Sequence, residues 1–227
     1  MEMSVVLPCL NEEETLQICI EKCFKSFQQL DVTGEVIVSD NGSSDKSVEI
    51  AQKCGARVVK CIQKGYGITL RTGFESAKGK YIVMGDADDT YDFLSIPKFY
   101  EKIISTNADM VIGSRLKGDI EKGAMPFLNR YIGTPILTAF INILYGTHIS
   151  DINCGLRMFK KSSYDKLKFT SDGMEFASEH VIEFRKHNMS IVEIPTNLSK
   201  DIDGRKPHLR IFRDGFRHLF LICSRRF

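Results

Sequence analysis

Several features that would assign this sequence to a common class are missing from it. Among its 227 residues, no uncharged apolar run reaches the ~20 residues that a membrane-spanning helix needs. The stretch from Tyr131 to Tyr145 comes nearest and is too short. No basic segment precedes an apolar run at the amino terminus, so we expect no signal peptide. The length instead suits one large α/β domain.

The sequence also lacks CxxC spacing and an excess of charge of one sign. The seven cysteines therefore predict reduced thiols in a cytosolic compartment rather than a zinc site or disulfides. The 31 Lys and Arg residues nearly balance the 29 Asp and Glu residues, so the net charge argues neither for nor against a nucleic-acid partner, and we expect none. Only residues 200–227 are strongly basic, with eight Lys or Arg against three Asp, and this tail favours an anionic partner.

Apolar segments typical of strands alternate with helical segments through the first half of the chain. This alternation predicts right-handed βαβ units and a mostly parallel sheet flanked by helices, which is the α/β class. Pro8 is expected to end the first strand. The expected strands are 3–7, 35–39, 57–61, 81–84 and 109–113, and the expected helices are 11–29, 46–54, 65–78 and 95–105.

The alternation breaks beyond Arg115. No internal repeat or low-complexity linker is present, so we predict a single domain over 1–227. It would comprise a nucleotide-binding half at 1–115, an acceptor half at 116–199 and the basic tail at 200–227. The second half is expected to contain a charged loop at 117–123, an apolar helix at 127–145, strands at 156–159 and 191–195, and a helix at 175–186.

The strand expected at 81–84 runs directly into the carboxylates of Asp86, Asp88 and Asp89. Side-chain direction repeats every second residue in a strand, so Asp86 and Asp88 are expected on the same side of the chain. Ligands collect at the carboxyl ends of strands in parallel α/β sheets. The pair therefore predicts a Mg²⁺ or Mn²⁺ site that holds a diphosphate, with a solvated acidic turn as the alternative.

Two further motifs of the first half indicate a nucleotide, each with a simpler alternative. Asp40 ends the second expected strand, where it can accept hydrogen bonds from a base or ribose, or serve as an ordinary turn residue. Gly65 and Gly67 resemble a phosphate-cradling turn. Arg71 follows on the same helix as a phosphate partner or as a surface charge.

The second half carries candidate side chains on two expected helices. Glu175 and Glu179 lie one turn apart and can contact a sugar or orient a nucleophile, or can simply stabilise the helix dipole. His180 and His187 are expected at the surface. The apolar stripe of the helix at 127–145 predicts a core helix, or else an interfacial helix beside Arg130.

Two families compete for the acidic segment. Asp86-Ala87-Asp88-Asp89-Thr90 has the DxDx[T/V] form of the haloacid dehalogenase-like phosphatases, in which Asp86 would be the nucleophile. In that family the motif follows the first strand, whereas here it follows the fourth expected strand. A phosphatase is therefore the alternative of a different class.

A longer set of motifs runs in order over essentially the whole chain and resembles glycosyltransferase family 2, with its GT-A fold. Within it the similarity is to the polyprenyl-phosphate glycosyltransferases typified by dolichyl-phosphate mannose synthase. The matching segments are 6–12 (VLPCLNE), 40–45 (DNGSSD), 64–67 (KGYG), 71–73 (RTG), 86–88 (DAD), 113–115 (GSR), 129–133 (NRYIG), 151–157 (DINCGLR), 173–176 (GMEF), 207–210 (PHLR) and 213–219 (RDGFRHL).

This resemblance implies an inverting, metal-dependent transfer of a hexose from a UDP- or GDP-sugar to a polyprenyl phosphate such as dolichyl or undecaprenyl phosphate. Asp86 and Asp88 would bind Mg²⁺ or Mn²⁺. Arg115, Arg130 and Thr134 would bind the acceptor, and the catalytic residues would be Asp88, Arg115, Arg130 and Glu175. The donor would be bound by Pro8, Asn11, Glu12, Asp40, Gly67, Arg71, Asp86, Ala87, Asp88, Arg205, Lys206 and Arg210.

The sequence departs from the family pattern in three places. Gln63 stands where Asn is frequent, and Thr90 stands where the mannose synthase offers Gln near the metal, so Thr90 is not expected to be a ligand. Residues 219–227 correspond to a segment that leads into transmembrane helices in many relatives. We therefore expect a protein peripheral to the cytoplasmic face of a membrane, or the soluble part of a membrane-anchored one.

Two other functions remain open at this point. The acceptor can instead be a soluble sugar or glycan. The chain can also be a nucleotide-sugar binding module without turnover.

Overall fold

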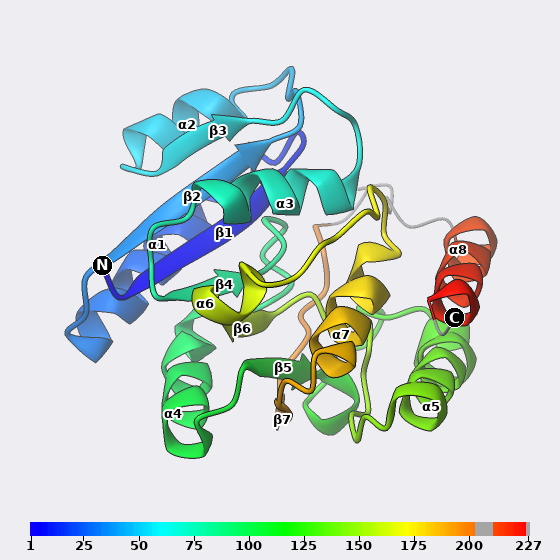
Figure 1. Ribbon diagram of the computed structural model, residues 1–227. Coiled ribbons are helices and arrows are strands. Elements are labelled where there is room, and N and C mark those ends of the chain that lie inside the picture. The colour runs from blue at the N-terminus through cyan, green and yellow to red at the C-terminus, as the bar shows by residue number, and fades with distance from the viewer. Residues whose placement is uncertain (203–210, 226–227) are drawn as a thin grey trace.

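The computed structural model describes residues 1–202 and 211–225, and these residues form one sheet of seven strands with helices on both faces (Figure 1). The strand order is β3-β2-β1-β4-β6-β5-β7. Strand β6 runs antiparallel to β4 and β5, and the other neighbouring pairs are parallel. The mostly parallel α/β sheet predicted from the sequence is thus confirmed. The strands are β1 (Met3–Cys9), β2 (Gly34–Asp40), β3 (Arg57–Lys60), β4 (Tyr81–Met84), β5 (Met110–Ser114), β6 (Arg157–Lys160) and β7 (Ile191–Pro195).

The helices divide between the two faces of the sheet. Contacts between helices group α1 with α2 and α4 on one face, and α3 with α7 on the other. The described helices are α1 (Leu16–Leu30), α2 (Ser47–Lys53), α3 (Tyr66–Ser76), α4 (Ile96–Thr106), α5 (Thr134–Tyr145), α6 (Lys161–Tyr164), α7 (Phe176–Lys186) and α8 (Ile211–Ser224). Short helical turns are η1 (Phe93–Ser95), η2 (Arg115–Lys117) and η3 (Asn129–Gly133). No helix in the described part of the chain is both long and apolar enough to cross a bilayer.

Two prolines affect the predicted element boundaries. Pro8 does not have the predicted effect on β1, and Pro135 lies where the predicted helix at 127–145 is divided. Pro8 does not end β1, because the strand continues to Cys9 with Pro8 opposite Ser39 of β2. The pairing of β1 with β4 stops at Val6, so the missing N–H of Pro8 interrupts no ladder on that side. Pro135 lies in the first turn of α5 and cannot donate to the preceding turn. The single helix predicted at 127–145 is accordingly a π-helical turn followed by α5.

The basic tail contains the helix α8, which was not predicted from the sequence. Within α8, Ile222 and His218 are buried, whereas Phe216 and Phe220 are exposed. The side chain of Arg217 pairs with Glu175, the residue just before α7, and that of Arg225 pairs with Glu179 and Glu183 of α7. The predicted donor-binding residues Arg205, Lys206 and Arg210 lie outside the described residues.

His180 is not at the surface as predicted, although His187 is exposed. The imidazole of His180 is fully buried, and its ring stacks on Phe176 with 5.4 Å between ring centroids and an interplanar angle of 21°. Neither ring nitrogen has a hydrogen-bond partner among the described residues. Further rings surround it, from Phe74, Phe159, Tyr164, Phe169 and Phe184. Helical spacing alone did not distinguish this inward position from a surface one.

Burial, followed by the nearby charge of Arg157, holds the pKa of His180 well below its usual value. The folded protein therefore keeps His180 neutral at a pH at which the unfolded chain binds a proton. Stability should be unaffected above about pH 6.5 and should fall as the pH drops below it, by up to ~1.4 kcal/mol per pH unit from this residue. Urea unfolding of wild type and His180→Phe between pH 7 and pH 5 measures the effect.

In the His180→Phe variant this part of the pH dependence should disappear. The control is His148→Gln, which removes an exposed histidine and should keep the wild-type slope. Equal pH dependence in wild type and His180→Phe would contradict the assignment.

Candidate active site

The predicted donor residues converge at one edge of the sheet. Cys9 lies opposite Asp40 at the carboxyl ends of β1 and β2, and β4 ends at Met84, just before the Asp86 segment. Because β6 is antiparallel, its first residue, Arg157, lies opposite Met84. The segment that leads into β6 therefore approaches the same edge as the acidic residues, as expected for a ligand site in such a sheet.

Asp86 and Asp88 are each partly exposed and are held by different parts of the chain. Oδ1 of Asp86 accepts a hydrogen bond from the Tyr66 hydroxyl at 2.8 Å. Oδ1 of Asp88 accepts bonds from the backbone N–H and the hydroxyl of Thr90, at 3.0 and 2.7 Å. Thr90 thus orients Asp88 from within the same turn.

The two carboxylates fit a hard divalent cation. Burial, followed by the negative charge of Asp88, raises the pKa of the Asp86 carboxyl well above its usual range. A bound cation would stabilise the ionised form and lower this pKa again. Among the described residues there is no group of three or more His, Cys, Asp or Glu side chains that could hold a metal alone. A cation here would need further oxygen ligands, which a diphosphate and water supply, and this is the usual arrangement for Mg²⁺.

The residues predicted to line the nucleotide pocket build a tight double turn. The carboxylate of Asp40 accepts hydrogen bonds from the amides of Gly42 and Ser43, at 3.1 and 3.0 Å. Asn11, with φ of 60°, accepts a bond from the amide of Ser44 at 2.7 Å through its side-chain oxygen. Glu12 is buried beside it. These contacts show the turn role of Asp40, while the nucleotide role of Asp40, Pro8, Asn11 and Glu12 stays a prediction.

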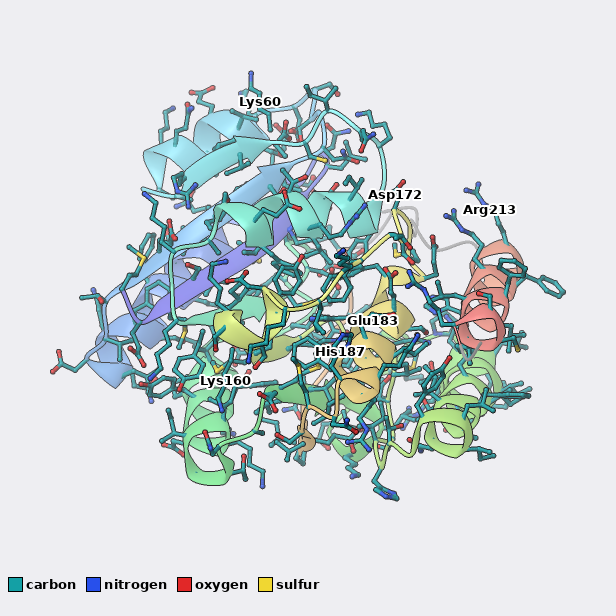
Figure 2. All side chains as sticks on the ribbon, viewed as in Figure 1. Lys60, Lys160, Asp172, Glu183, His187 and Arg213 are labelled. Carbon is teal, nitrogen blue, oxygen red and sulfur yellow. The ribbon has the colours of Figure 1, made fainter. Side chains whose placement is uncertain are left out.

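The glycine motif at the start of α3 is not an open phosphate cradle. The amides of Gly67 and Ile68 donate to the carbonyl of Asp172, at 2.8 and 3.3 Å, and Asp172 lies beside the first turn of α3 (Figure 2). A Cβ at Gly67 would come within 2.5 Å of the Ser171 carbonyl oxygen. The glycine is therefore required for close packing of the 171–173 segment, while the donor-binding role of Gly67 stays a prediction.

Arg71 serves the same contact rather than projecting as a surface charge. Its guanidinium donates to the carbonyl oxygen of Phe169 at 2.7 Å and pairs with the carboxylate of Asp172. This placement accounts for Arg71 without a phosphate.

Of the predicted acceptor residues, Arg115 is committed to an internal ion pair. Its guanidinium binds the fully buried Asp151 carboxylate in a bidentate manner, at 2.7 and 2.8 Å, and its amide donates to the same group at 3.1 Å. Such a fork fixes the loop after β5 against the segment before β6. No spacing in the sequence indicates Asp151 as the partner of Arg115.

Arg130 is the predicted acceptor-binding arginine that has no carboxylate partner among the described residues. It is half-buried, its guanidinium carbon lies 5.4 Å from the ring centroid of Tyr131, and within residues 1–202 and 211–225 it makes no ion pair. Thr134 is buried and accepts only a long contact, 3.4 Å, from the side-chain amide of Asn153. The two residues share one stretch of chain at the start of α5.

Glu175 begins α7 with one satisfied and one unsatisfied oxygen. Oε1 accepts from Arg217 at 2.6 Å and from the amide of Gly173 at 3.3 Å. Oε2 is buried and has no partner in the described part of the chain. Glu175 lines a surface groove of about 500 Å³ together with Phe216 and Phe220 of α8. By contrast, Glu179 accepts from the amides of Thr170 and Ser171 and pairs with Arg225, so it is structural.

Sequence reasoning missed two residues beside the acidic pair. Tyr66 was part of a quoted motif but received no role. Arg157 is fully buried and donates to the carbonyls of Cys154, Ile152 and Ala177, at 2.9, 2.7 and 2.9 Å. An arginine in the otherwise apolar strand expected at 156–159 was the available signal for a buried cation near the site.

A mostly parallel sheet with paired aspartates at its carboxyl edge is the arrangement expected of the GT-A fold. The structure matches glucosyl-3-phosphoglycerate synthase from Mycobacterium tuberculosis with a TM-score of 0.78 at 21% identity, over 98% of this chain and 80% of that one. Another structure of that enzyme, which contains Mn²⁺, UDP-glucose and phosphoglyceric acid, matches with a TM-score of 0.78 at 20% identity, over 99% and 79% of the two chains. Residues 4–168 match "Glycosyl transferase family 2", and the chain belongs to that family.

Two of the curated relatives come from Haloferax volcanii. The low-salt glycan biosynthesis hexosyltransferase Agl6 is 42% identical over 96% of this chain and 52% of its own, so this chain spans about half the length of that relative. A dolichyl-phosphate hexose transferase is 30% identical over 86% of this chain and 81% of its own. Membership of the family favours the glycosyltransferase interpretation over the phosphatase alternative.

The packing role of Gly67 predicts a large effect of one methyl group on stability. Gly67→Ala would push a Cβ into the Ser171 carbonyl oxygen, and overpacking of this kind costs ~1–3 kcal/mol. Gly215→Ala in α8 is the control, because a Cβ there meets nothing within 4 Å and alanine favours a helix. Urea unfolding should show a lower midpoint for Gly67→Ala only. An unchanged midpoint would mean that the segment at 171–173 does not rest on α3 as described.

Proposed function

We propose that this chain transfers a hexose, with inversion, from a UDP- or GDP-sugar to the phosphate of a polyprenyl lipid. The observation that carries the proposal is the pair Asp86 and Asp88 at the carboxyl edge of β4, in a chain of glycosyltransferase family 2. The neighbouring structure that contains Mn²⁺ and UDP-glucose supports the metal and the class of donor.

In this proposal residues 1–115 bind the donor, and Asp86 with Asp88 would hold Mg²⁺ or Mn²⁺ against its diphosphate. The cation would stabilise the negative charge that develops on the departing nucleoside diphosphate. The turn built by Asp40 and Asn11 would take the nucleoside, because it sits at the ends of the adjacent strands β1 and β2.

The acceptor phosphate needs positioning rather than a strong base. A phosphate monoester has a second pKa of ~6 and is therefore largely ionised at neutral pH. Its oxygen can attack the anomeric carbon once an arginine holds it near the donor. Arg130 is the best candidate for that contact because its charge has no internal carboxylate partner in the described residues, whereas Arg115 is paired with Asp151.

An exposed apolar surface supports a lipid acceptor. It consists of Phe127, Leu128, Tyr131, Ile132, Ile136, Phe140 and Ile143 along η3 and α5, with Phe216 and Phe220 on α8. Helices α5 and α8 lie side by side (Figure 1), and the Tyr145 hydroxyl donates to the carbonyl of Ile222 at 2.6 Å. Residues 124–150 contain no Asp or Glu, and their one Lys or Arg is Arg130. Such a surface suits the interface of a bilayer with anionic headgroups, at the cytoplasmic face.

The relatives support two kinds of acceptor. The dolichyl-phosphate hexose transferase from H. volcanii favours the lipid phosphate. The synthase from M. tuberculosis, whose structures contain phosphoglyceric acid, is the reason to keep a soluble acceptor as the second candidate. The exposed apolar surface favours the lipid acceptor, because a soluble acceptor does not require it.

The proposal predicts that Asp88→Ala abolishes transfer while the protein stays folded. Wild type incubated with labelled UDP- or GDP-hexose, Mn²⁺ and polyprenyl phosphate should carry the label into an organic extract. Loss of a metal ligand removes several kcal/mol of transition-state stabilisation, so the rate should fall at least ~100-fold. Asp165→Ala, at an exposed carboxylate of an i,i+4 pair, should retain the wild-type rate. Full activity of Asp88→Ala, or label found only in a soluble product, would contradict the proposal.

If the exposed apolar surface binds a membrane, a single charge introduced on α5 should weaken that binding. Ile143 is 81% exposed on α5, and Ile143→Asp should reduce co-sedimentation with vesicles that contain anionic lipid by about tenfold, since a buried charge at the interface opposes binding. Ile62→Asp is the matched control, because Ile62 is 94% exposed and lies outside this surface. Equal sedimentation of the two variants would remove the surface from the proposal.

A further inference from the structure

The Tyr66 hydroxyl connects α3 to the acidic pair. Tyr66 is the first residue of α3, is half-buried, and donates to Oδ1 of Asp86 at 2.8 Å. The first turn of α3 is itself fixed, because the amides of Gly67 and Ile68 bind the Asp172 carbonyl. The donor that reaches Asp86 therefore comes from a rigid element.

The second oxygen of Asp86 is confined by packing. A Cβ at Gly155 would come within 2.5 Å of Oδ2 of Asp86, so this oxygen rests directly against the backbone of the segment before β6. The amide of Gly155 donates to the Tyr91 hydroxyl at 2.9 Å, which fixes that backbone in turn. The carboxylate of Asp86 is thus held on both sides, by a hydroxyl donor and by a close backbone contact.

Asp88 receives its hydroxyl hydrogen bond from within its own turn, unlike Asp86. This difference shows what Tyr66 contributes to the site. Thr90, two residues further along the same turn, donates to Oδ1 of Asp88 through both its backbone N–H and its hydroxyl. Asp86 receives its hydroxyl contact from a residue 20 positions earlier in the sequence. The relative orientation of the two carboxylates therefore depends in part on a contact between elements, which the Tyr66 side chain makes.

We propose that Tyr66 is a positioning residue of the metal site, whose hydroxyl holds the Asp86 carboxylate in the orientation that a divalent cation requires. This inference rests on the proposed function, because it takes Asp86 and Asp88 to be the metal ligands. A hydroxyl that donates to one lone pair of a carboxylate oxygen leaves the other lone pairs for a cation. Partners of this kind, which contact a ligand and not the metal, typically change metal affinity by ~10–100-fold.

The test measures Mn²⁺ binding directly, without turnover. Electron paramagnetic resonance distinguishes free from bound Mn²⁺, and titrations with the full chain are run with Mn²⁺ alone and with UDP or GDP present. In Tyr66→Phe, which keeps the ring and removes the hydroxyl, the dissociation constant for Mn²⁺ should rise about tenfold. Activity measured against Mn²⁺ concentration should show the same shift, with kcat recovering at saturating metal.

Tyr100→Phe is the matched control. It removes a tyrosine hydroxyl that donates to a carboxylate at a similar distance, 2.9 Å to Oε1 of Glu2, but on α4 and outside the site. Its dissociation constant for Mn²⁺ should equal that of wild type. Any loss of folded protein in Tyr66→Phe lowers the number of bound ions, not the dissociation constant of the folded fraction, so the comparison holds for a less stable variant.

The outcomes separate this inference from the function on which it rests. If wild type binds Mn²⁺, Asp88→Ala does not, and Tyr66→Phe binds as tightly as wild type, only the role of Tyr66 is overturned. If wild type binds no Mn²⁺ with either nucleotide, the metal site fails and the role of Tyr66 fails with it. A tenfold weaker Tyr66→Phe beside an unchanged Tyr100→Phe supports the inference.

Discussion

The structure depends on two like charges at the end of a buried strand. Strand β4 is entirely buried, and it delivers Asp86 and Asp88 to the edge of the sheet, where their charges disfavour one another. Two carboxylates in such proximity are stable as anions only with nearby donors or a cation. The chain supplies a hydroxyl donor to each, from Tyr66 and from Thr90, and the nearby charges of Arg115 and Arg157 also favour the Asp86 anion.

Several of the arginines in the second half of the chain are paired with carboxylates of the protein itself. The guanidinium of Arg115 is taken by Asp151, that of Arg217 by Glu175, and that of Arg225 by Glu179 and Glu183. A paired arginine fixes the backbone but offers little net charge to a ligand. Among the predicted acceptor residues this leaves Arg130, at the border of the exposed apolar surface, as the charge available to an incoming phosphate.

The sequence predicted those features that depend on periodicity and on chain order. Alternating strands and helices gave the α/β class, and the position of the Asp-x-Asp segment after a strand gave its place at the sheet edge. It did not predict contacts between distant segments, because spacing carries no information about them. Gly67 was assigned to a phosphate from its motif. The structure shows that a side chain at this position would collide with the Ser171 carbonyl oxygen, and the motif does not indicate that contact. His180 was assigned to the surface, because helical spacing does not say which face of α7 meets the aromatic core.

The same limitation applies to the division of the chain into donor and acceptor halves. Strand β6, from the second half, lies between β4 and β5 in the sheet. Its leading segment places Gly155 against Asp86, and the Asp172 carbonyl, further along, fixes the start of α3. Both constraints on the Asp86 carboxylate thus depend on residues that follow Arg115. A site whose Asp86 carboxylate is held by segments from both halves of the chain should respond as a unit to changes in either half, because displacement of the 171–173 segment moves Tyr66, and Tyr66 holds Asp86.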